Sequence, residues 1–190
     1  MIMTNKLIVF SAPSGAGKTT LVKYILETFS EIQFSISATS RKARGEEKDG
    51  KDYYFLSSKE FKTRVENDEF IEYEEVYGGN YYGTLKSELK RIWQDKKIAI
   101  FDLDVVGGAN IKSMFPDQTL SIFVMPPSIE ILKRRLLERG DVSREEVDVR
   151  IKKAEIELDY ASKFDNIIIN NDLEESKKIA LTLIKEFIDE

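Results

Sequence analysis

The stretch Leu7-Ile-Val-Phe-Ser-Ala-Pro-Ser-Gly-Ala-Gly-Lys-Thr-Thr20 decides the fold of this chain. Its apolar start, residues 7–10, predicts a buried strand, which ends abruptly in small, turn-forming residues. Gly17-Lys18-Thr19 then opens a segment with apolar residues at helical spacing. A strand, a glycine-rich loop and a helix in this order predict a phosphate-binding loop, because the loop N–H groups converge on an anion at the positive end of the helix.

The residues of this loop are expected to hold a nucleoside triphosphate. Lys18 would reach the β- and γ-phosphates, and the Thr19 hydroxyl would bind the accompanying Mg²⁺. Ala12 replaces the first glycine of the pattern G-x-x-x-x-G-K-[ST]. An alanine fits there if the position needs no positive φ, so we expect the loop to keep its shape. The triphosphate-binding set is Ala12, Pro13, Ser14, Gly15, Ala16, Gly17, Lys18, Thr19 and Thr20.

Composition narrows the chemistry. The chain of 190 residues contains no cysteine and no histidine, and its net charge is −5. Without disulfides, thiolate metal sites or the commonest general base, its chemistry must use carboxylates, lysine, arginine, tyrosine and hydroxyl groups. We see no apolar run of membrane-spanning length and no secretion signal, so we expect a cytoplasmic protein with no membrane partner. The negative net charge argues against a nucleic-acid partner.

Apolar runs along the chain predict the central sheet. Four nearly continuous runs, residues 7–10, 98–101, 120–124 and 167–169, indicate buried parallel strands, and residues 32–36 add a shorter candidate. Helical patterns separate these runs, which is typical of a doubly wound α/β fold. We therefore expect a three-layer fold of the P-loop type, with a five-stranded parallel sheet flanked by helices.

Residues 37–84 interrupt this alternation. They are polar and rich in tyrosine and glutamate, with strand-like pieces at residues 53–56, 70–77 and 80–82. Ser57-x-x-Glu60 is a capping box that starts a short helix, and Gly78-Gly79-Asn80 indicates a hairpin turn. These features predict a small α+β lobe inserted into a core of residues 1–36 and 85–190. Such a lobe would lie beyond the carboxyl ends of the strands, where open α/β sheets bind ligands.

Two carboxylates, Asp102 and Asp104, follow the apolar run that starts at Ile98. In phosphate-loop proteins an aspartate at a strand end holds Mg²⁺ directly or through water. Asp102 is therefore the second candidate magnesium residue beside Thr19, with binding most reasonably through water. Because side chains alternate along a strand, we expect both carboxylates on one face. A simple polar strand end is the alternative interpretation.

Basic residues gather in two places despite the negative net charge. One group is Arg41, Lys42 and Arg44, and the other is Lys133, Arg134, Arg135, Arg139, Arg144 and Arg150. Arginine forks bind phosphate oxygens bidentately, so both groups are candidates for contact with an anionic substrate. A solvated basic loop is the alternative for the first group.

The order of motifs along the chain resembles the guanylate kinase family of nucleoside monophosphate kinases. The matching stretches are Ser11-Ala-Pro-Ser-Gly-Ala-Gly-Lys-Thr19, Phe34-Ser-Ile-Ser-Ala-Thr-Ser-Arg41, Gly50-Lys-Asp-Tyr53, Phe70-Ile-Glu72, Asn80-Tyr-Tyr-Gly-Thr84, Asp102-Leu-Asp104, Pro126-Pro-Ser128, Arg135-Leu-Leu-Glu-Arg139-Gly140 and Ala154-x-x-Glu157. Each is weak alone, and together they are specific and cover nearly the whole chain. The resemblance implies phosphorylation of GMP by ATP with Mg²⁺ (ATP + GMP = ADP + GDP) in purine nucleotide metabolism, with dGMP as a further acceptor and a monomer or homodimer as the active species.

The resemblance also implies how the acceptor is held. It places Ser37, Glu72, Thr84 and Asp104 around the guanine, and Arg41, Arg44, Tyr53 and Tyr82 on the GMP phosphate. A carboxylate such as Glu72 can accept hydrogen bonds from both the N1–H and the N2–H₂ donors of guanine. Adenine lacks this pair of donors, so a buried carboxylate would discriminate against it.

A helical lid is expected at about residues 137–150, with a hinge-like break at Gly140. By resemblance, Arg139 and Arg150 close over the transferring phosphoryl group, and Lys18, Arg44 and Asp102 complete the catalytic set. Phosphoryl transfer mainly needs positioning and neutralisation of spread negative charge. A site without histidine or cysteine is therefore chemically complete.

Two alternative functions stay open at this point. A guanylate-kinase-like interaction module would share the fold, but such modules tend to lose the phosphate loop, which here keeps Gly15, Gly17, Lys18 and Thr19. A kinase with the same donor but with AMP, UMP or another monophosphate as acceptor is the other alternative. ATP binding separates the first from a kinase, and turnover across the monophosphates separates the second.

Overall fold

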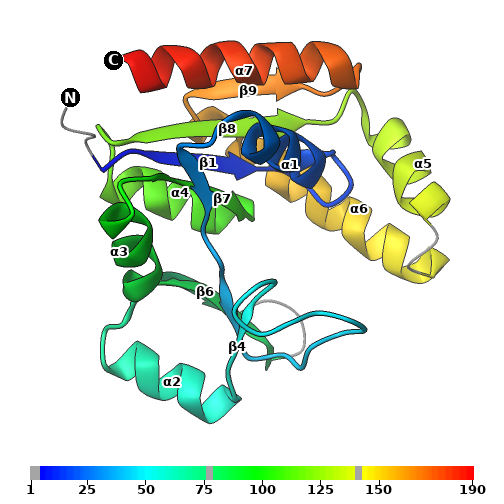
Figure 1. Cartoon of the computed structure of the whole chain (residues 1–190). Coiled ribbons are helices and arrows are strands. Elements are labelled where there is room, and N and C mark those ends of the chain that lie inside the picture. The colour runs from blue at the N-terminus through cyan, green and yellow to red at the C-terminus, as the bar shows by residue number, and fades with distance from the viewer. Residues whose placement is uncertain (1–4, 76–78, 140–142) are drawn as a thin grey trace.

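A five-stranded parallel sheet forms the centre of the molecule (Figure 1). The computed structural model describes residues 5–75, 79–139 and 143–190. The sheet has the order β2-β7-β1-β8-β9, and every pair of neighbours is parallel. Its strands are β1 Leu7–Ser11, β2 Ile32–Phe34, β7 Ile98–Leu103, β8 Thr119–Met125 and β9 Asn166–Ile169. The predicted sheet is thereby confirmed.

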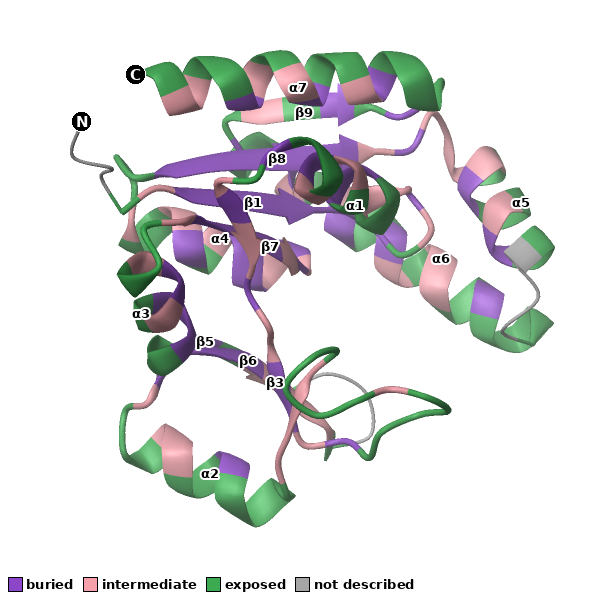
Figure 2. Cartoon of the chain, in the orientation of Figure 1, coloured by how far each residue is buried: buried purple, intermediate pink, exposed green. Residues whose placement is uncertain are grey.

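Alternation along β1 divides the core into two layers. Ile8 and Phe10 belong to the cluster on the side of α1 and α7, whereas Leu7 and Val9 belong to the cluster on the side of α3 and α4. The elements that cover the sheet are α1 Lys18–Thr28, α3 Lys86–Gln94, α4 Val105–Met114, the 3₁₀ turn η2 Asp159–Lys163 and α7 Leu173–Asp189. The central strands are accordingly buried on both faces (Figure 2). Among the described residues, no helix has both the length and the apolarity to cross a bilayer.

Two helices, α5 (Ile129–Arg139) and α6 (Arg144–Leu158), form an arm at one end of the sheet (Figure 1). Lys133 Nζ on α5 lies 2.6 Å from Asp148 Oδ1 on α6, and Leu132, Leu136 and Val147 of the two helices belong to one buried apolar cluster. The predicted lid, residues 137–150, falls within this arm and stays a prediction. Its expected break at Gly140 lies outside the described residues.

The inserted segment carries a second, four-stranded sheet of order β4-β3-β6-β5. Its elements are β3 Ala38–Thr39, β4 Tyr54–Phe55, α2 Ser58–Glu66, β5 Phe70–Glu75 and β6 Tyr81–Leu85. The predicted capping box of Ser57 and Glu60 starts α2. Phe61 on α2 stacks on Phe70 at 4.4 Å between ring centroids, so the lobe has an apolar centre of its own. Residues 76–78, which include Gly78 of the predicted hairpin turn, are outside the described part.

Candidate active site

A cavity of about 1110 Å³ lies between the phosphate loop, the arm and the lobe, at the carboxyl end of the sheet. It is lined by these predicted site residues: Ala12, Pro13, Ser14, Gly15, Gly17, Lys18, Thr19, Thr20, Arg44, Tyr82, Asp102, Asp104 and Arg150. Arg135, from the second predicted basic group, also lines it, and the lining residues not predicted as ligand contacts are Asn80, Glu146, Val149, Lys153 and Glu157. Of the described residues predicted for the site, those that do not line the cavity are Ala16, Ser37, Arg41, Tyr53, Glu72 and Thr84. The Arg139 side chain is outside the described part.

The phosphate loop has the backbone that the sequence requires. Gly15 and Gly17 adopt positive φ values of 91° and 99°. A Cβ added at Gly17 would lie 2.2 Å from Asn170 Nδ2, so only glycine fits there. The described non-glycine residues with positive φ are Asp68 and Lys96, so Ala12 has an ordinary backbone, and the loop accepts it as predicted.

Asn170, at the end of β9, holds the loop from behind. Its Nδ2 donates to the carbonyl oxygen of Ala16 at 2.7 Å, and its own Oδ1 accepts from the Ser176 hydroxyl at 3.1 Å. Arg135 donates to the Asn170 carbonyl oxygen at 2.9 Å. Asn170 is not among the predicted site residues. The only signal was a polar residue directly after a buried apolar run, and nothing in that pattern names a partner 154 positions away.

Asp102 joins the two residues that follow the loop glycines. Lys18 Nζ lies 2.6 Å from Asp102 Oδ1 and also donates to the Leu103 carbonyl oxygen, while the Thr19 hydroxyl donates to Asp102 Oδ2 at 2.7 Å. A hydroxyl and a carboxylate are hard oxygen ligands, and Mg²⁺ in such sites uses one or two of them together with waters and substrate phosphates. In the described ranges, no group of three or more acidic side chains could hold a metal alone. The residues present therefore fit a Mg²⁺ that arrives with the triphosphate.

Asp104 lies beyond the strand, at the N-cap of α4. Its carboxylate accepts from the Gly107 N–H at 2.8 Å. Both Asp102 and Asp104 line the cavity, as expected for residues two positions apart on an extended chain, and Asp104 also caps α4. The helix itself was hard to see in the sequence because Gly107 and Gly108 interrupt its apolar pattern.

Carboxylates converge where the resemblance places the guanine. Glu72 on β5 is 8% exposed, and its Oε1 accepts from the Thr84 hydroxyl at 2.7 Å. A Cβ added at Gly107 would lie 3.0 Å from Glu72 Oε2 and 3.4 Å from Asp104 Oδ1, so both acids border this glycine. Burial raises the pKa of Glu72 to about 7; the negative charge of Asp104 adds to this, and the hydrogen bond from Thr84 opposes it. Glu72 is thus poised to ionise when donors approach it.

A third acid at this end, Glu74, was not predicted. A hydrogen bond with Asp104 and, second, burial raise the pKa of Glu74 to about 8. The pKa of Asp104 is lowered: burial opposes this change, and the hydrogen bonds from Glu74 and the Gly107 N–H outweigh it. Near neutral pH these shifts favour the protonated form of Glu74 and the ionised form of Asp104.

Replacing Glu74 with glutamine should make stability less dependent on pH. The pKa of Glu74 rises on folding from about 4.5 to about 8, so between these values the folded state binds more protons. The free energy of unfolding then falls as pH rises through this window, and a neutral glutamine removes that fall. Because Glu74 is partly exposed, we expect its contribution to the fall in the free energy of unfolding to be only about 1 kcal/mol between pH 5 and pH 8. Urea unfolding at both pH values measures it, with Glu75→Gln as the exposed control; equal pH slopes for Glu74→Gln and wild type would contradict the assignment.

Arg41 is held by Glu47. Its two terminal nitrogens donate to the Glu47 carboxylate at 2.6 and 2.8 Å, and its Nε donates to the Tyr82 hydroxyl at 3.0 Å. The guanidinium carbon also lies 4.8 Å from the centroid of the Tyr53 ring. The hydrogen bond from Arg41 lowers the pKa of Glu47 to about 2. The structure thus brings Arg41, Tyr53 and Tyr82 together as expected, but a carboxylate occupies the fork, and it is Arg44 that lines the cavity.

The arm reaches the phosphate loop through Arg150. One terminal nitrogen of Arg150, on α6, donates to the Ser14 hydroxyl at 3.3 Å. A positive charge from the arm therefore lies at the edge of the phosphate loop.

Comparisons with known proteins agree with this geometry. The family model described as guanylate kinase matches residues 4–189. A guanylate kinase of Bacteroides thetaiotaomicron is 52% identical over 98% of this chain and 92% of its own length, and one of Porphyromonas gingivalis is 53% identical over 88% and 90%. The crystal structure of guanylate kinase from Anaplasma phagocytophilum matches with a TM-score of 0.74 at 31% identity, over 95% of this chain and 85% of its own. The resemblance seen in the sequence is confirmed: the chain belongs to the guanylate kinase family of phosphotransferases.

Proposed function

We propose that this cavity transfers the γ-phosphoryl group of ATP to GMP, giving ADP and GDP, in cytoplasmic purine nucleotide metabolism. The observation that carries the proposal is the lining of one cavity by the phosphate loop and, from the lobe, by Arg44 and Tyr82. Donor and acceptor phosphates can therefore meet inside a single enclosure. All proposed residues come from one chain, so the proposal holds equally for a monomer and for a homodimer.

The donor is held by the loop and the start of α1. Backbone N–H groups of residues 14–17 surround the β- and γ-phosphates, and Lys18 turns from Asp102 toward them. Thr19 and, through water, Asp102 would hold a Mg²⁺, which would supply neutralisation of the phosphate charge. Arg150, beside Ser14, meets the spread charge of the transferring group, and Arg139 is proposed to join it.

The acceptor is held by the lobe. Glu72 accepts from the N1–H and N2–H₂ groups of guanine, with Ser37, Thr84 and Asp104 at the remaining edge positions. Arg44 and Tyr82 bind the GMP phosphate from the cavity wall, with Tyr53 beside them. Arg41 is a proposed contact as well, which requires its fork to exchange Glu47 for the phosphate.

The reaction needs no nucleophile from the protein. A phosphate oxygen of GMP attacks the γ-phosphorus in line, a new O–P bond forms, and the bond between the γ-phosphorus and the β-phosphate oxygen breaks as ADP leaves. The side chains position the two phosphates and neutralise their charge. This is consistent with a chain that lacks histidine and cysteine.

Turnover across the monophosphates tests the proposal. With ATP and Mg²⁺, ADP production should be fastest with GMP, slower with dGMP, and lower by about 10⁴ in kcat/KM with AMP, because a site built for a hydrogen-bonding edge rejects the base that lacks it. A folded protein that makes no ADP with GMP would contradict the function. Calorimetry with ATP then identifies the alternative, since an interaction module without a donor site shows no ATP binding.

A further inference from the structure

The chain passes from the core to the lobe through a short hinge segment, residues 35–37, between β2 and β3. The first residue of the hinge segment is tied to the core, since the Ser35 N–H donates to the Ile100 carbonyl oxygen at 2.9 Å. The last is tied to the lobe, since the Ser37 carbonyl oxygen accepts from the Tyr54 N–H at 2.9 Å. The chain therefore passes from the core to the lobe at the residue between Ser35 and Ser37.

That middle residue, Ile36, is bonded to a buried carboxylate on the return path. Glu88 lies in the first turn of α3, where the chain re-enters the core, and is 2% exposed. Its Oε1 accepts from the Ile36 N–H at 3.0 Å and from Arg91 at 2.7 Å. Its Oε2 accepts from the Tyr54 hydroxyl at 2.8 Å and from Arg91 Nε at 3.0 Å. The Glu88 side chain thus links the start of α3, where the chain returns to the core, with the hinge segment and with the lobe strand β4.

A buried carboxylate is tolerated only with such partners. The pKa of Glu88 is lowered: burial opposes this, and the hydrogen bonds from Arg91, the Ile36 N–H and Tyr54 outweigh it. The bond with Arg91 is local to α3, so it would survive a movement of the lobe. The bonds with Ile36 and Tyr54 cross between the two parts, so rotation of the lobe would leave the charge short of donors.

We propose that Glu88 is a positioning residue for the acceptor site, which fixes the resting orientation of the lobe and, through Ile36, the place of Ser37. The proposal rests on the proposed function only in naming GMP as the molecule whose binding weakens when the contacts of Glu88 are lost. The restraint on the lobe follows from the hydrogen bonds alone.

Glu88→Gln tests this through substrate binding. Glutamine offers one acceptor oxygen in place of two and carries no charge, so the four hydrogen bonds that Glu88 accepts cannot all persist, and the contacts that tie the lobe to α3 are weakened. We expect KM for GMP to rise about tenfold, equivalent to about 1.4 kcal/mol, with KM for ATP unchanged. Asp95→Asn is the matched control, because Asp95 is a largely exposed partner of Arg91, 4.0 Å away, and does not touch the hinge segment. A parallel rise in both KM values would overturn the proposal.

Tyr54→Phe is the milder variant and decides the question if Glu88→Gln does not fold. It removes the Tyr54 hydroxyl that donates to Glu88 and leaves the hydrogen bond between Glu88 and the Ile36 N–H in place. We expect KM for GMP to rise about threefold, as for loss of one modest hydrogen bond. Unchanged KM for GMP in the folded variants would overturn the positioning role.

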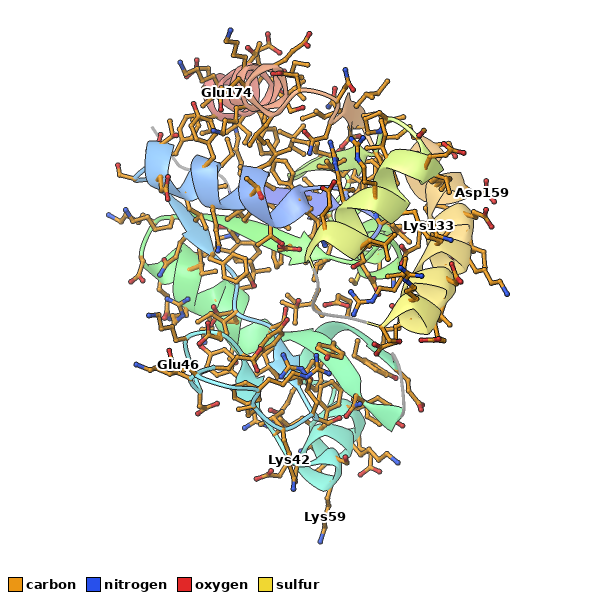
Figure 3. All side chains as sticks on the ribbon, turned by 90° about the vertical axis from the view of Figure 1, so that its right-hand side faces the viewer. Lys42, Glu46, Lys59, Lys133, Asp159 and Glu174 are labelled. Carbon is orange, nitrogen blue, oxygen red and sulfur yellow. The ribbon has the colours of Figure 1, made fainter. Side chains whose placement is uncertain are left out.

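A distance measurement tests the restraint without any activity. The chain has no cysteine, so Lys59→Cys on α2 and Glu174→Cys on α7 can carry a fluorophore pair. Figure 3 shows these residues at opposite ends of the molecule. Without nucleotides, the wild-type pair should give one narrow distribution of transfer efficiency, and Glu88→Gln should broaden or shift it. Identical distributions would overturn the proposal, whereas a wild type that fails to phosphorylate GMP would contradict only the proposed function.

Discussion

Replacing Lys18 with methionine should lower kcat for GMP phosphorylation about a thousandfold, because the change removes the positive charge aimed at the transferring phosphoryl group. Methionine keeps most of the apolar stem, so packing is largely preserved. Asp102 loses its ion pair but keeps the hydrogen bond from Thr19 at 2.7 Å. We therefore expect a folded protein with little activity. Steady-state kinetics with saturating ATP and GMP measure the effect.

The matched control for this change is Lys23→Met, which removes an exposed lysine from the same helix. It should leave kcat within a factor of about two, since surface charges away from a site contribute little. If Lys18→Met retained a tenth or more of the wild-type kcat, Lys18 would not be the main cationic contact of the donor phosphates. Circular dichroism of both variants excludes unfolding as the cause.

Replacing Glu72 with glutamine should remove most of the preference for GMP over AMP. Glu72 is buried, and its Oε1 already accepts from Thr84, so the base recognition depends on the ionised carboxylate. A glutamine amide would present an N–H₂ group to the guanine donors and leave one of them unpaired. An unpaired donor in a polar site lowers kcat/KM strongly. We therefore expect kcat/KM for GMP to fall by about 10³, while kcat/KM for AMP changes little.

Both substrates should be measured on the same preparation, with Glu75→Gln as the control from the exposed end of β5. KM for ATP should be unchanged in both variants, because the donor end of the cavity is untouched. If Glu72→Gln kept the wild-type ratio of GMP to AMP turnover, base recognition would have to come from other residues, such as Ser37 or Asp104.

The sheet and the phosphate loop were predictable because each leaves a local trace. A strand buried on both faces needs a continuous apolar run, as in β1 and β8. The loop needs glycines at positive φ directly before a helix, as at Gly15 and Gly17. The capping box that starts α2 is equally local. Patterns of this kind survive in the sequence because each involves neighbours along the chain.

The parts that were missed depend on contacts between distant residues. Glu47 was not singled out as the partner of Arg41, and Glu88 looks like an ordinary helix glutamate until its bonds with Ile36 and Tyr54 are seen. That Asp104 caps α4 could not be inferred either, because Gly107 and Gly108 break the apolar pattern of that helix. The sequence around a polar side chain does not indicate its hydrogen-bond partner, whereas the spacing of apolar residues indicates which face of an element is buried.

The bond between Asn170 and the Ala16 carbonyl has a consequence for the order in which a newly made chain acquires its shape. On the ribosome β1 emerges first, but its sheet neighbours start only at Ile98 and Thr119, and the amide that holds the loop comes later still. During most of its synthesis the nascent chain therefore has no finished pocket that ATP could stabilise. The phosphate loop therefore comes early in the sequence but is among the last parts of the site to reach its final structure.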